Sequence, residues 1–311
     1  MTKKQKGLWA LVPILMMSCT GSDEPLLSVQ TSSDGVISKI TVSAQDYRHE
    51  NETRGITYTG SSTPFAWTEK DTVGIYPDKG DQMAFSMAAG VGTSTANIDG
   101  GAWGLKSDAW YAAYSPFNRK NFFNDREHIL LDYTGQVETG IANADHLGAY
   151  DFQAANDTRR SEEGTLNFML ERLNSILILR LTVPQPGTYT EIRLTADDEV
   201  FTTQAQLALG ENYVFKPIKK QKTVTLGLKD VTTTETNQVA DFLMMLAPVD
   251  LTGKTYTVSL IGANGYVYKG TKTPTKAYEA GAATRTAITL KLDEGSNIGM
   301  GGEFTTEESE M

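Results

Sequence analysis

The sequence predicts a mostly β protein, and three observations support this fold class. Threonine and glycine are frequent among the 311 residues, as in chains with many strands and turns. Apolar and polar residues alternate with a period of two over residues 192–195, 223–228 and 255–260. Asn264-Gly265, a strong β-hairpin signal, lies between two strand-like runs. We therefore expect the second half to form an antiparallel sandwich.

The N-terminus has the order of elements of a bacterial lipoprotein signal. Three lysines within the first six residues precede an apolar run, Leu8–Met17, that is too short to span a bilayer. The run leads to the only cysteine of the chain through a segment that resembles a lipobox, Leu15-Met16-Met17-Ser18-Cys19. We expect a signal peptide over residues 1–18 and a lipid on Cys19 that anchors the protein, since each buried methylene contributes about 0.8 kcal/mol. The alternative is a cytosolic protein with an apolar N-terminus.

The residues after Cys19 predict a tether and a location. Residues 19–34 are polar, and Thr20–Glu24 is similar to the acidic tag of Bacteroidetes lipoproteins that reach the outer face of the outer membrane. Loss of the three signal-peptide lysines takes the net charge from −10 to −13, which disfavours binding to nucleic acid. We therefore expect a surface-exposed lipoprotein in the outer membrane, with no nucleic-acid partner.

Strands are predicted along the first half of the chain from residue 35 onward. Val36–Val42, Asp71–Pro77 and Trp110–Pro116 have the composition of strands, and a charged stretch, Gln45–Arg54, follows the first of them. Leu166–Leu181 is the most apolar run after the signal. Leu166, Met169, Leu170 and Leu173 within it are spaced like one face of a helix. The spacing therefore predicts a helical turn before the next strand.

Ser175–Val183 has the composition of a strand buried on both faces. Pro184–Gly187 then interrupts regular structure, and we place a domain boundary there, with an N-terminal domain over residues 35–185 and a C-terminal domain over residues 186–293. The last strand is predicted over Thr286–Leu292, with residues 288, 290 and 292 facing inward. Residues 294–311 form an acidic, glycine-rich tail.

A search for catalytic chemistry finds no motif. The three histidines have no partner at metal-ligand spacing, and no Gly-x-Ser-x-Gly elbow is present. Asp145-His146 is the one adjacent acid and imidazole, but neighbouring side chains point in different directions, so a turn role is favoured. Carboxylates brought together from distant positions remain an alternative. We expect no enzyme activity, no catalytic residue, no cofactor and no metal.

The aromatic residues support two interpretations. Trp67, Trp103, Trp110, Tyr111 and Tyr114 could stack on sugars, but most aromatic side chains in β-sandwiches belong to the core. Core packing is therefore favoured. The alternative function is a surface glycan-binding lipoprotein of a polysaccharide-uptake system, which would use Trp67 or Trp103.

Six segments of the chain share a recognisable order: Phe65–Tyr76, Trp110–Pro116, Ala144–Leu147, Leu166–Leu173, Leu246–Gly253 and Tyr278–Gly281. Taken together, they resemble the fimbrillin family, the Bacteroidales type V pilins and their lipoprotein relatives. One departure is Leu170, where relatives often have histidine. The resemblance implies two tandem transthyretin-like antiparallel β-sandwich domains. It also implies a structural or adhesive subunit of a fimbrium that binds other pilin subunits and a host or bacterial surface ligand.

The resemblance also implies an assembly mechanism. In pilins of this family a protease cuts after an arginine, an N-terminal strand leaves, and the C-terminal strand of the next subunit fills the groove by strand addition. Arg54 lies where that cut is expected, although it could equally be a loop residue. In the tail, Ile298 and Met300 have the spacing of a donor strand, but Gly301-Gly302 would weaken it. A tip, anchor or accessory subunit therefore fits better than a stalk subunit.

Overall fold

The computed structural model describes residues 37–45, 47–49, 66–100, 105–106, 109–122, 124–158 and 164–296. Regular structure in these ranges consists of twenty strands and two short 3₁₀ helices, η1 (Leu147–Tyr150) and η2 (Glu294–Ser296). The prediction of a mostly β protein is confirmed. In this part of the chain, no helix has the length and apolar character needed to cross a bilayer.

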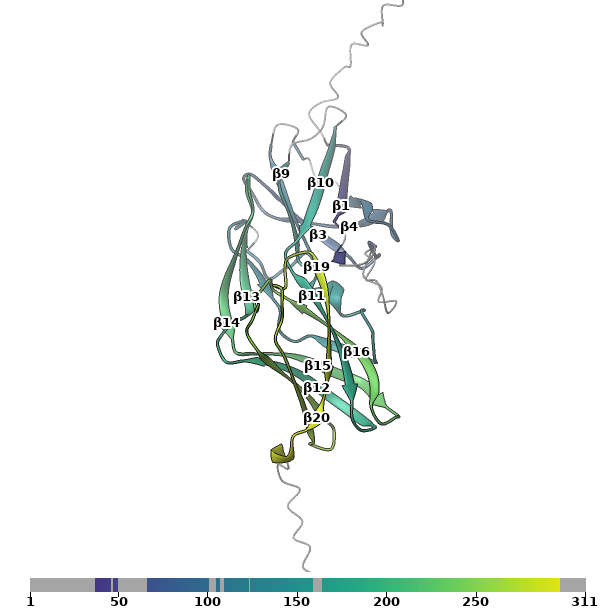
Figure 1. The fold of residues 1–311 in the computed structure, drawn as a ribbon. Helices are drawn as coiled ribbons and strands as arrows, with labels where there is room; N and C mark the ends of the chain where they lie inside the picture. The colour runs from purple at the N-terminus through teal and green to yellow at the C-terminus, as the bar shows by residue number, and fades with distance from the viewer. Residues whose placement is uncertain are drawn as a thin grey trace, which may run out of the picture. The chain divides into compact units, whose positions relative to one another are not determined.

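Seven strands of the first half close into a barrel, in the order β1-β10-β9-β6-β3-β4-β5 (Figure 1). β1 closes it by pairing parallel with β10 and antiparallel with β5. Inward-facing residues such as Val73, Phe85 and Leu166 fill the interior with an apolar core. The strands are β1 (Lys39–Ala44), β3 (Thr72–Pro77), β4 (Met83–Ala89), β5 (Thr95–Asp99), β6 (Tyr111–Ser115), β9 (Gln153–Thr158) and β10 (Thr165–Arg172).

The helical turn predicted over Leu166–Leu173 is wrong, because most of this segment forms strand β10. Its burial has a period of two, with Leu166, Phe168 and Leu170 inside the barrel, while Met169 is 65% exposed. A short apolar run matches both periodicities, so sequence spacing alone does not separate them. Pairing with β1 and β9 makes the segment a strand.

A second group of strands forms two sheets that face each other. The inner sheet has the order β16-β11-β19-β2, and the outer sheet has the order β20-β18-β17-β12-β15-β8. The inner strands are β2 (Arg48–His49), β11 (Ser175–Val183), β16 (Gln238–Leu246) and β19 (Ala282–Thr289). The outer strands are β8 (Val137–Thr139), β12 (Gly187–Ala196), β15 (Thr223–Thr233), β17 (Tyr256–Gly262), β18 (Val267–Lys272) and β20 (Lys291–Leu292).

The inner sheet is buried on both faces, as β11 shows. Leu177 and Leu179 belong to the core shared with the outer sheet. Ile176 and Ile178 belong to a different core, which is shared with the base of the barrel and a third sheet. That side sheet has the order β14-β13-β7 and is built from β7 (Ile129–Asp132), β13 (Phe201–Ala208) and β14 (Val214–Gln221). The prediction that Ser175–Val183 is a strand buried on both sides is confirmed.

The hairpin predicted at Asn264-Gly265 is confirmed, since β17 and β18 pair antiparallel around it. Gly265 has φ +83°, a backbone conformation that glycine adopts without strain. The predicted last strand is correct only in part. Ile288 and Leu290 are buried, but Leu292 is 40% exposed in β20, which pairs with β18 of the outer sheet. The chain changes sheets between β19 and β20, so the inward alternation does not extend to Leu292.

The predicted domain boundary lies where the chain passes from the inner sheet to the outer sheet, between β11 and β12. Strands before this point pair with strands after it: β7 with β13, β8 with β15, and β11 with both β16 and β19. The division into residues 35–185 and 186–293, and their assignment as tandem transthyretin-like sandwiches, stay predictions. The signal peptide, residues 19–34 and the tail beyond Ser296 lie outside the described residues.

We expect Gly74→Ala to destabilise the protein, by about 2 kcal/mol, the size of typical overpacking costs. Gly74 in β3 lies against the buried Tyr114 ring, whose hydroxyl donates to Gln82 Oε1 at 2.6 Å, and an added methyl group would collide with that ring. Gly148→Ala is the matched control, since nothing lies within 4 Å of the position that its Cβ would take. Urea unfolding followed by tryptophan fluorescence measures both. Equal stability of the two variants would contradict the packing argument.

Candidate functional site

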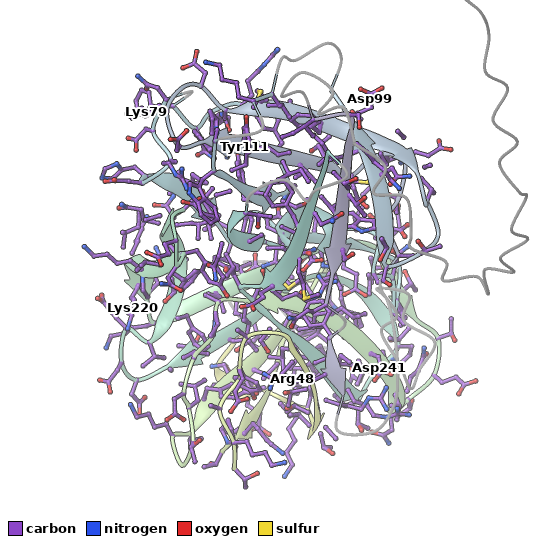
Figure 2. All side chains as sticks on the ribbon, turned by 90° about the horizontal axis from the view of Figure 1, so that it is seen from above. Arg48, Lys79, Asp99, Tyr111, Lys220 and Asp241 are labelled. Carbon is purple, nitrogen blue, oxygen red and sulfur yellow. The ribbon has the colours of Figure 1, made fainter. Side chains whose placement is uncertain are left out.

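One short segment, residues 37–49, joins the barrel to the inner sheet, and we call it the strap. It contributes β1 to the barrel and β2 to the edge of the inner sheet, where Arg48 and His49 pair with Ala282 and Ala283 of β19. Figure 1 shows β1, near the purple end of the colour scale, beside β10. Arg48 is labelled in Figure 2. The strap therefore completes two β structures at once.

β1 presents an apolar face to the barrel interior. Ile40, Val42 and Ala44 are buried in the barrel core. Burying an isoleucine or valine side chain contributes roughly 1.5–3 kcal/mol. On the opposite face, the Thr41 hydroxyl donates to Asn97 of β5 at 3.3 Å. Without β1, the facing edges of β5 and β10 would lose their hydrogen-bond partners and the core would be open.

Backbone hydrogen bonds hold the strap beyond the barrel. The Gln45 N–H donates to the Leu170 carbonyl at 3.2 Å, and Arg172 Nε donates to the Gln45 carbonyl at 2.7 Å. Further along, the Arg48 N–H donates to the Gly281 carbonyl at 2.6 Å. The strap is thus attached along its length from β10 to the residue before β19.

Between these attachments, Tyr47 enters a buried polar cluster, which we call the latch: Tyr47, Asp151, Arg172 and Asn174. The Tyr47 hydroxyl donates to Asp151 Oδ1 at 2.6 Å and accepts from Asn174 Nδ2 at 2.5 Å. Arg172 forms an ion pair with Asp151, and these two side chains are 1% and 3% exposed. The Arg172 guanidinium carbon also lies 4.2 Å from the centre of the Tyr47 ring. Tyr47 therefore contacts both members of a buried charge pair.

Burial in the latch shifts the pKa values of Tyr47 and Arg172. Burial, reinforced by the neighbouring Asp151 carboxylate, holds the pKa of Tyr47 well above its usual value, so its hydroxyl remains a donor. Burial lowers the pKa of the Arg172 guanidinium, but Asp151 outweighs this and the net shift is upward. A buried ion pair depends on its supporting hydrogen bonds. Loss of the Tyr47 hydroxyl would remove one buried hydrogen bond from Asp151 Oδ1, which would keep the bond from Asn174 Nδ2 at 3.2 Å, at a cost of about 1–3 kcal/mol.

The other edge of the inner sheet, at β16, is closed by side chains. The Leu243 N–H donates to Glu138 Oε2 at 2.9 Å, and its carbonyl lies 3.0 Å from His146 Nε2. The Met245 N–H donates to Gln136 Oε1 at 2.8 Å, and Gln136 Nε2 donates to the Met245 carbonyl at 2.7 Å. An open edge can add a foreign strand. At β16 the backbone groups of Leu243 and Met245 are already paired.

The predicted turn role of Asp145-His146 is confirmed. The pair lies in the turn before η1, and His146 Nε2 contacts the backbone of β16 rather than the Asp145 carboxylate. Burial lowers the pKa of His146, so the ring is neutral and donates from Nε2. The described ranges hold no group of three or more His, Cys, Asp or Glu side chains arranged as metal ligands.

The core interpretation of the aromatic residues is confirmed for three of them. Trp67 is 1% exposed and its Nε1 donates to the Ser94 carbonyl at 3.1 Å. Tyr111 and Tyr114 are also buried, whereas Trp110 is 39% exposed. Trp67 is therefore too buried to stack on a sugar, as the glycan-binding alternative would require.

The site residues predicted from the sequence lie outside the part of the chain that the structure describes. Lipidation of Cys19, processing at Arg54 and strand donation by Ile298 and Met300 stay predictions, and Trp103 is likewise not described. The latch was missed by sequence reasoning. Its available signals were an isolated tyrosine in the charged stretch 45–54, and a charged residue, Arg172, inside the most apolar run.

Comparison with known proteins identifies the fold. A candidate cell adhesion protein from Bacteroides ovatus is 12% identical, and the match covers 83% of this chain and 96% of that one with a TM-score of 0.50. The chain has the fold of this protein. A second candidate cell adhesion protein, from Bacteroides uniformis, is 11% identical with a TM-score of 0.49, and the match covers 82% and 95% of the two chains.

The tip fimbrial protein Mfa3 from Porphyromonas gingivalis is 11% identical with a TM-score of 0.32, over 74% of this chain and 80% of that one. No protein-family model matches the chain. No curated protein matches it by sequence. At these identities the likeness concerns the fold alone.

We expect stability to depend on Glu138 between about pH 5 and pH 8. Burial raises the pKa of Glu138 to about 8, above the value of about 4.3 for an exposed glutamate. The folded protein therefore binds a proton in this window that the unfolded chain lacks, so the Glu138 contribution to stability falls as pH rises through it and is constant above about pH 8. The lowered pKa of His146 acts in the opposite direction.

Glu138→Gln removes the Glu138 contribution and leaves that of His146. The free energy of unfolding, measured in urea from pH 5 to pH 9, should fall more with pH in the wild type than in the variant. Exposed Glu199→Gln is the control and should follow the wild-type curve. Parallel curves for wild type and Glu138→Gln would contradict the assignment.

Proposed function

We propose that this chain is a fimbrillin-like outer-membrane lipoprotein. In this role it is a structural or adhesive subunit of a type V pilus, at the tip, at the anchor or as an accessory, and it accepts a strand from another subunit in place of the strap. The observation that carries the proposal is the position of β1. The apolar side chains of β1 are part of the barrel core. In the sequence, however, β1 lies before Arg54, the predicted processing site, so a cut there would separate β1 from the rest of the chain.

A cut after Arg54 would leave the strap held only by non-covalent contacts. These are the apolar face of β1, its two ladders of backbone hydrogen bonds, the latch and the short pairing with β19. If the strap leaves, an apolar groove remains between the unpaired edges of β5 and β10. Such a groove favours addition of another strand with alternating apolar residues, because that strand restores both the ladders and the core.

The tail of this chain supports an acceptor role better than a stalk role. Ile298, Met300 and Gly302 repeat the two-residue spacing of Ile40, Val42 and Ala44. Two adjacent glycines in the donor segment weaken a strand, since glycine loses much conformational freedom on ordering and offers no side chain to the groove. A subunit that accepts a strand but donates a poor one belongs at an end of the pilus or beside it.

The N-terminal features complete the proposal. A lipid on Cys19 would hold the subunit at the outer membrane. The acidic residues after Cys19 would act as the signal that sends the lipoprotein to the cell surface. There the subunit would contact other pilin subunits by strand addition and a host or bacterial surface ligand. The likeness in fold to a candidate Bacteroides cell adhesion protein is consistent with this role. The proposal assigns no catalytic residue and no cofactor.

We expect Arg54→Ala to abolish a processed form of the protein. Outer-membrane fractions of cells that express the wild type should contain, on a blot against the C-terminal half, a band shortened by removal of residues up to 54. The variant should lack this band because the protease finds no arginine at its site. Arg119→Ala, in an exposed turn, should be processed normally. A wild-type protein that is never shortened would refute the strand-exchange role.

We expect Cys19→Ala to lose both lipid and membrane attachment. Cells grown with radiolabelled palmitate should yield a labelled wild-type protein in the membrane fraction and an unlabelled variant. The reason is that acyl chains on this thiol supply the burial energy of the anchor. An unlabelled wild-type protein in the cytosol would contradict the lipoprotein assignment.

A further inference from the structure

We propose that the latch selects the partner subunit, because an incoming strand is accepted well only when it brings a tyrosine to the position of Tyr47. This inference rests on the strand exchange proposed above. It adds the chemistry of the partner: a strand with the pattern apolar-x-apolar-x-small-x-x-Tyr, which supplies the residues now at 40, 42, 44 and 47.

The backbone contacts of the strap carry little selectivity. β1 pairs with β5 and β10 through main-chain groups, and the Gln45 N–H and carbonyl contact the Leu170 carbonyl and Arg172 Nε. Any strand in the same register offers the same groups, and only proline lacks the N–H. Discrimination between incoming strands must therefore come from side chains.

The barrel interior selects for shape and apolarity, and the latch selects for chemistry. When the strap leaves, Asp151 Oδ1 loses the Tyr47 hydroxyl at 2.6 Å, and the Arg172 guanidinium loses the ring 4.2 Å away. A phenylalanine would restore the ring but not the hydroxyl, so it would bury Asp151 without that donor. An alanine would restore neither contact. A site built to hydrogen-bond a hydroxyl discriminates against ligands that lack one, because its polar groups lose a hydrogen bond. Here Asp151 Oδ1 would keep the bond from Asn174 Nδ2 at 3.2 Å but lose the shorter one.

The latch can be reached by an incoming residue once the strap has left. Arg172 lines a surface hollow together with Gln45 and Arg48, two residues of the strap. Arg48 also lines a second hollow beside Lys272 and Arg285, along β19. Departure of the strap therefore uncovers the latch from the side on which a strand would enter.

The tail of this chain does not carry the required pattern. In the strap, the tyrosine follows Ala44 by three positions. In the tail, Phe304 follows Gly302 by only two positions, and phenylalanine has no hydroxyl. If Gly302 takes the place of Ala44, position 47 is taken by Thr305. The latch therefore disfavours a second copy of this chain as the donor and favours a different subunit with a tyrosine at this position.

Strand exchange with synthetic peptides tests the proposal. The full mature chain, with a specific protease site in place of residues 52–55, is folded, cut and loaded with a fluorescent peptide of residues 37–49. Unlabelled peptides then compete for the groove: the same sequence, its Tyr47→Phe and Tyr47→Ala forms, and a peptide of residues 295–307. Lys39→Ala is the matched control because Lys39 lies in β1 with its side chain exposed.

We expect Tyr47→Phe to compete about tenfold more weakly and Tyr47→Ala about a hundredfold more weakly, the losses expected for one buried hydrogen bond and for the hydrogen bond plus the ring. The 295–307 peptide should be weaker than the strap sequence, and Lys39→Ala should lie within about twofold of it. In an Asp151→Asn acceptor the preference for tyrosine over phenylalanine should shrink.

Two results would overturn the proposal in distinguishable ways. Equal competition by the tyrosine, phenylalanine and alanine peptides would refute selection by the latch and leave strand exchange standing. Failure of the cut protein to release and rebind even the strap sequence would refute strand exchange itself, and the selection with it. The peptide variants do not alter the acceptor, so its folding does not affect the comparison.

Discussion

The barrel depends on the hydrogen bonds and side chains that β1 supplies between β5 and β10. A β-sheet leaves unpaired N–H and C=O groups at its edges, and closure into a barrel is the way to remove them. Here the closing strand is the first described strand of the chain, and its apolar face completes the core. The stability of the first half therefore depends on the strap.

The two edges of the inner sheet are protected in different ways, and the difference bears on function. At β16, Gln136, Glu138 and His146 pair with backbone groups through side chains that belong to the body of the fold. At β19, the partner is β2 of the strap. The side-chain contacts at β16 do not involve the strap, whereas Ala282 and Ala283 of β19 would lose their strand partner if the strap left. The proposed strand exchange would therefore change the β19 edge and leave the β16 edge paired.

Much of the second half was predictable, because its strands are half-buried and carry a period of two. Ile192, Leu194 and Leu226 are buried, and the polar residues between them are exposed or partly exposed, as their alternation indicated. The segment containing β10 was mistaken for a helix because Leu166 and Leu170 fit both periods. The latch was not predictable, since Tyr47, Asp151, Arg172 and Asn174 are separated by up to 127 residues and meet only when the strap crosses to the inner sheet.

The sequence by itself determined the mostly β class, the positions of many strands, the hairpin at Asn264-Gly265, and the likeness to fimbrillins. These follow from local propensity, periodicity and short motifs, which are properties of neighbouring residues. Only the tertiary structure decided that β1 closes a barrel, that Trp67 is core, and that Tyr47 completes a buried charge pair. The physical reason is that strand partners and buried polar contacts join residues far apart in the chain, and a local pattern does not encode which distant edge or charge it will meet.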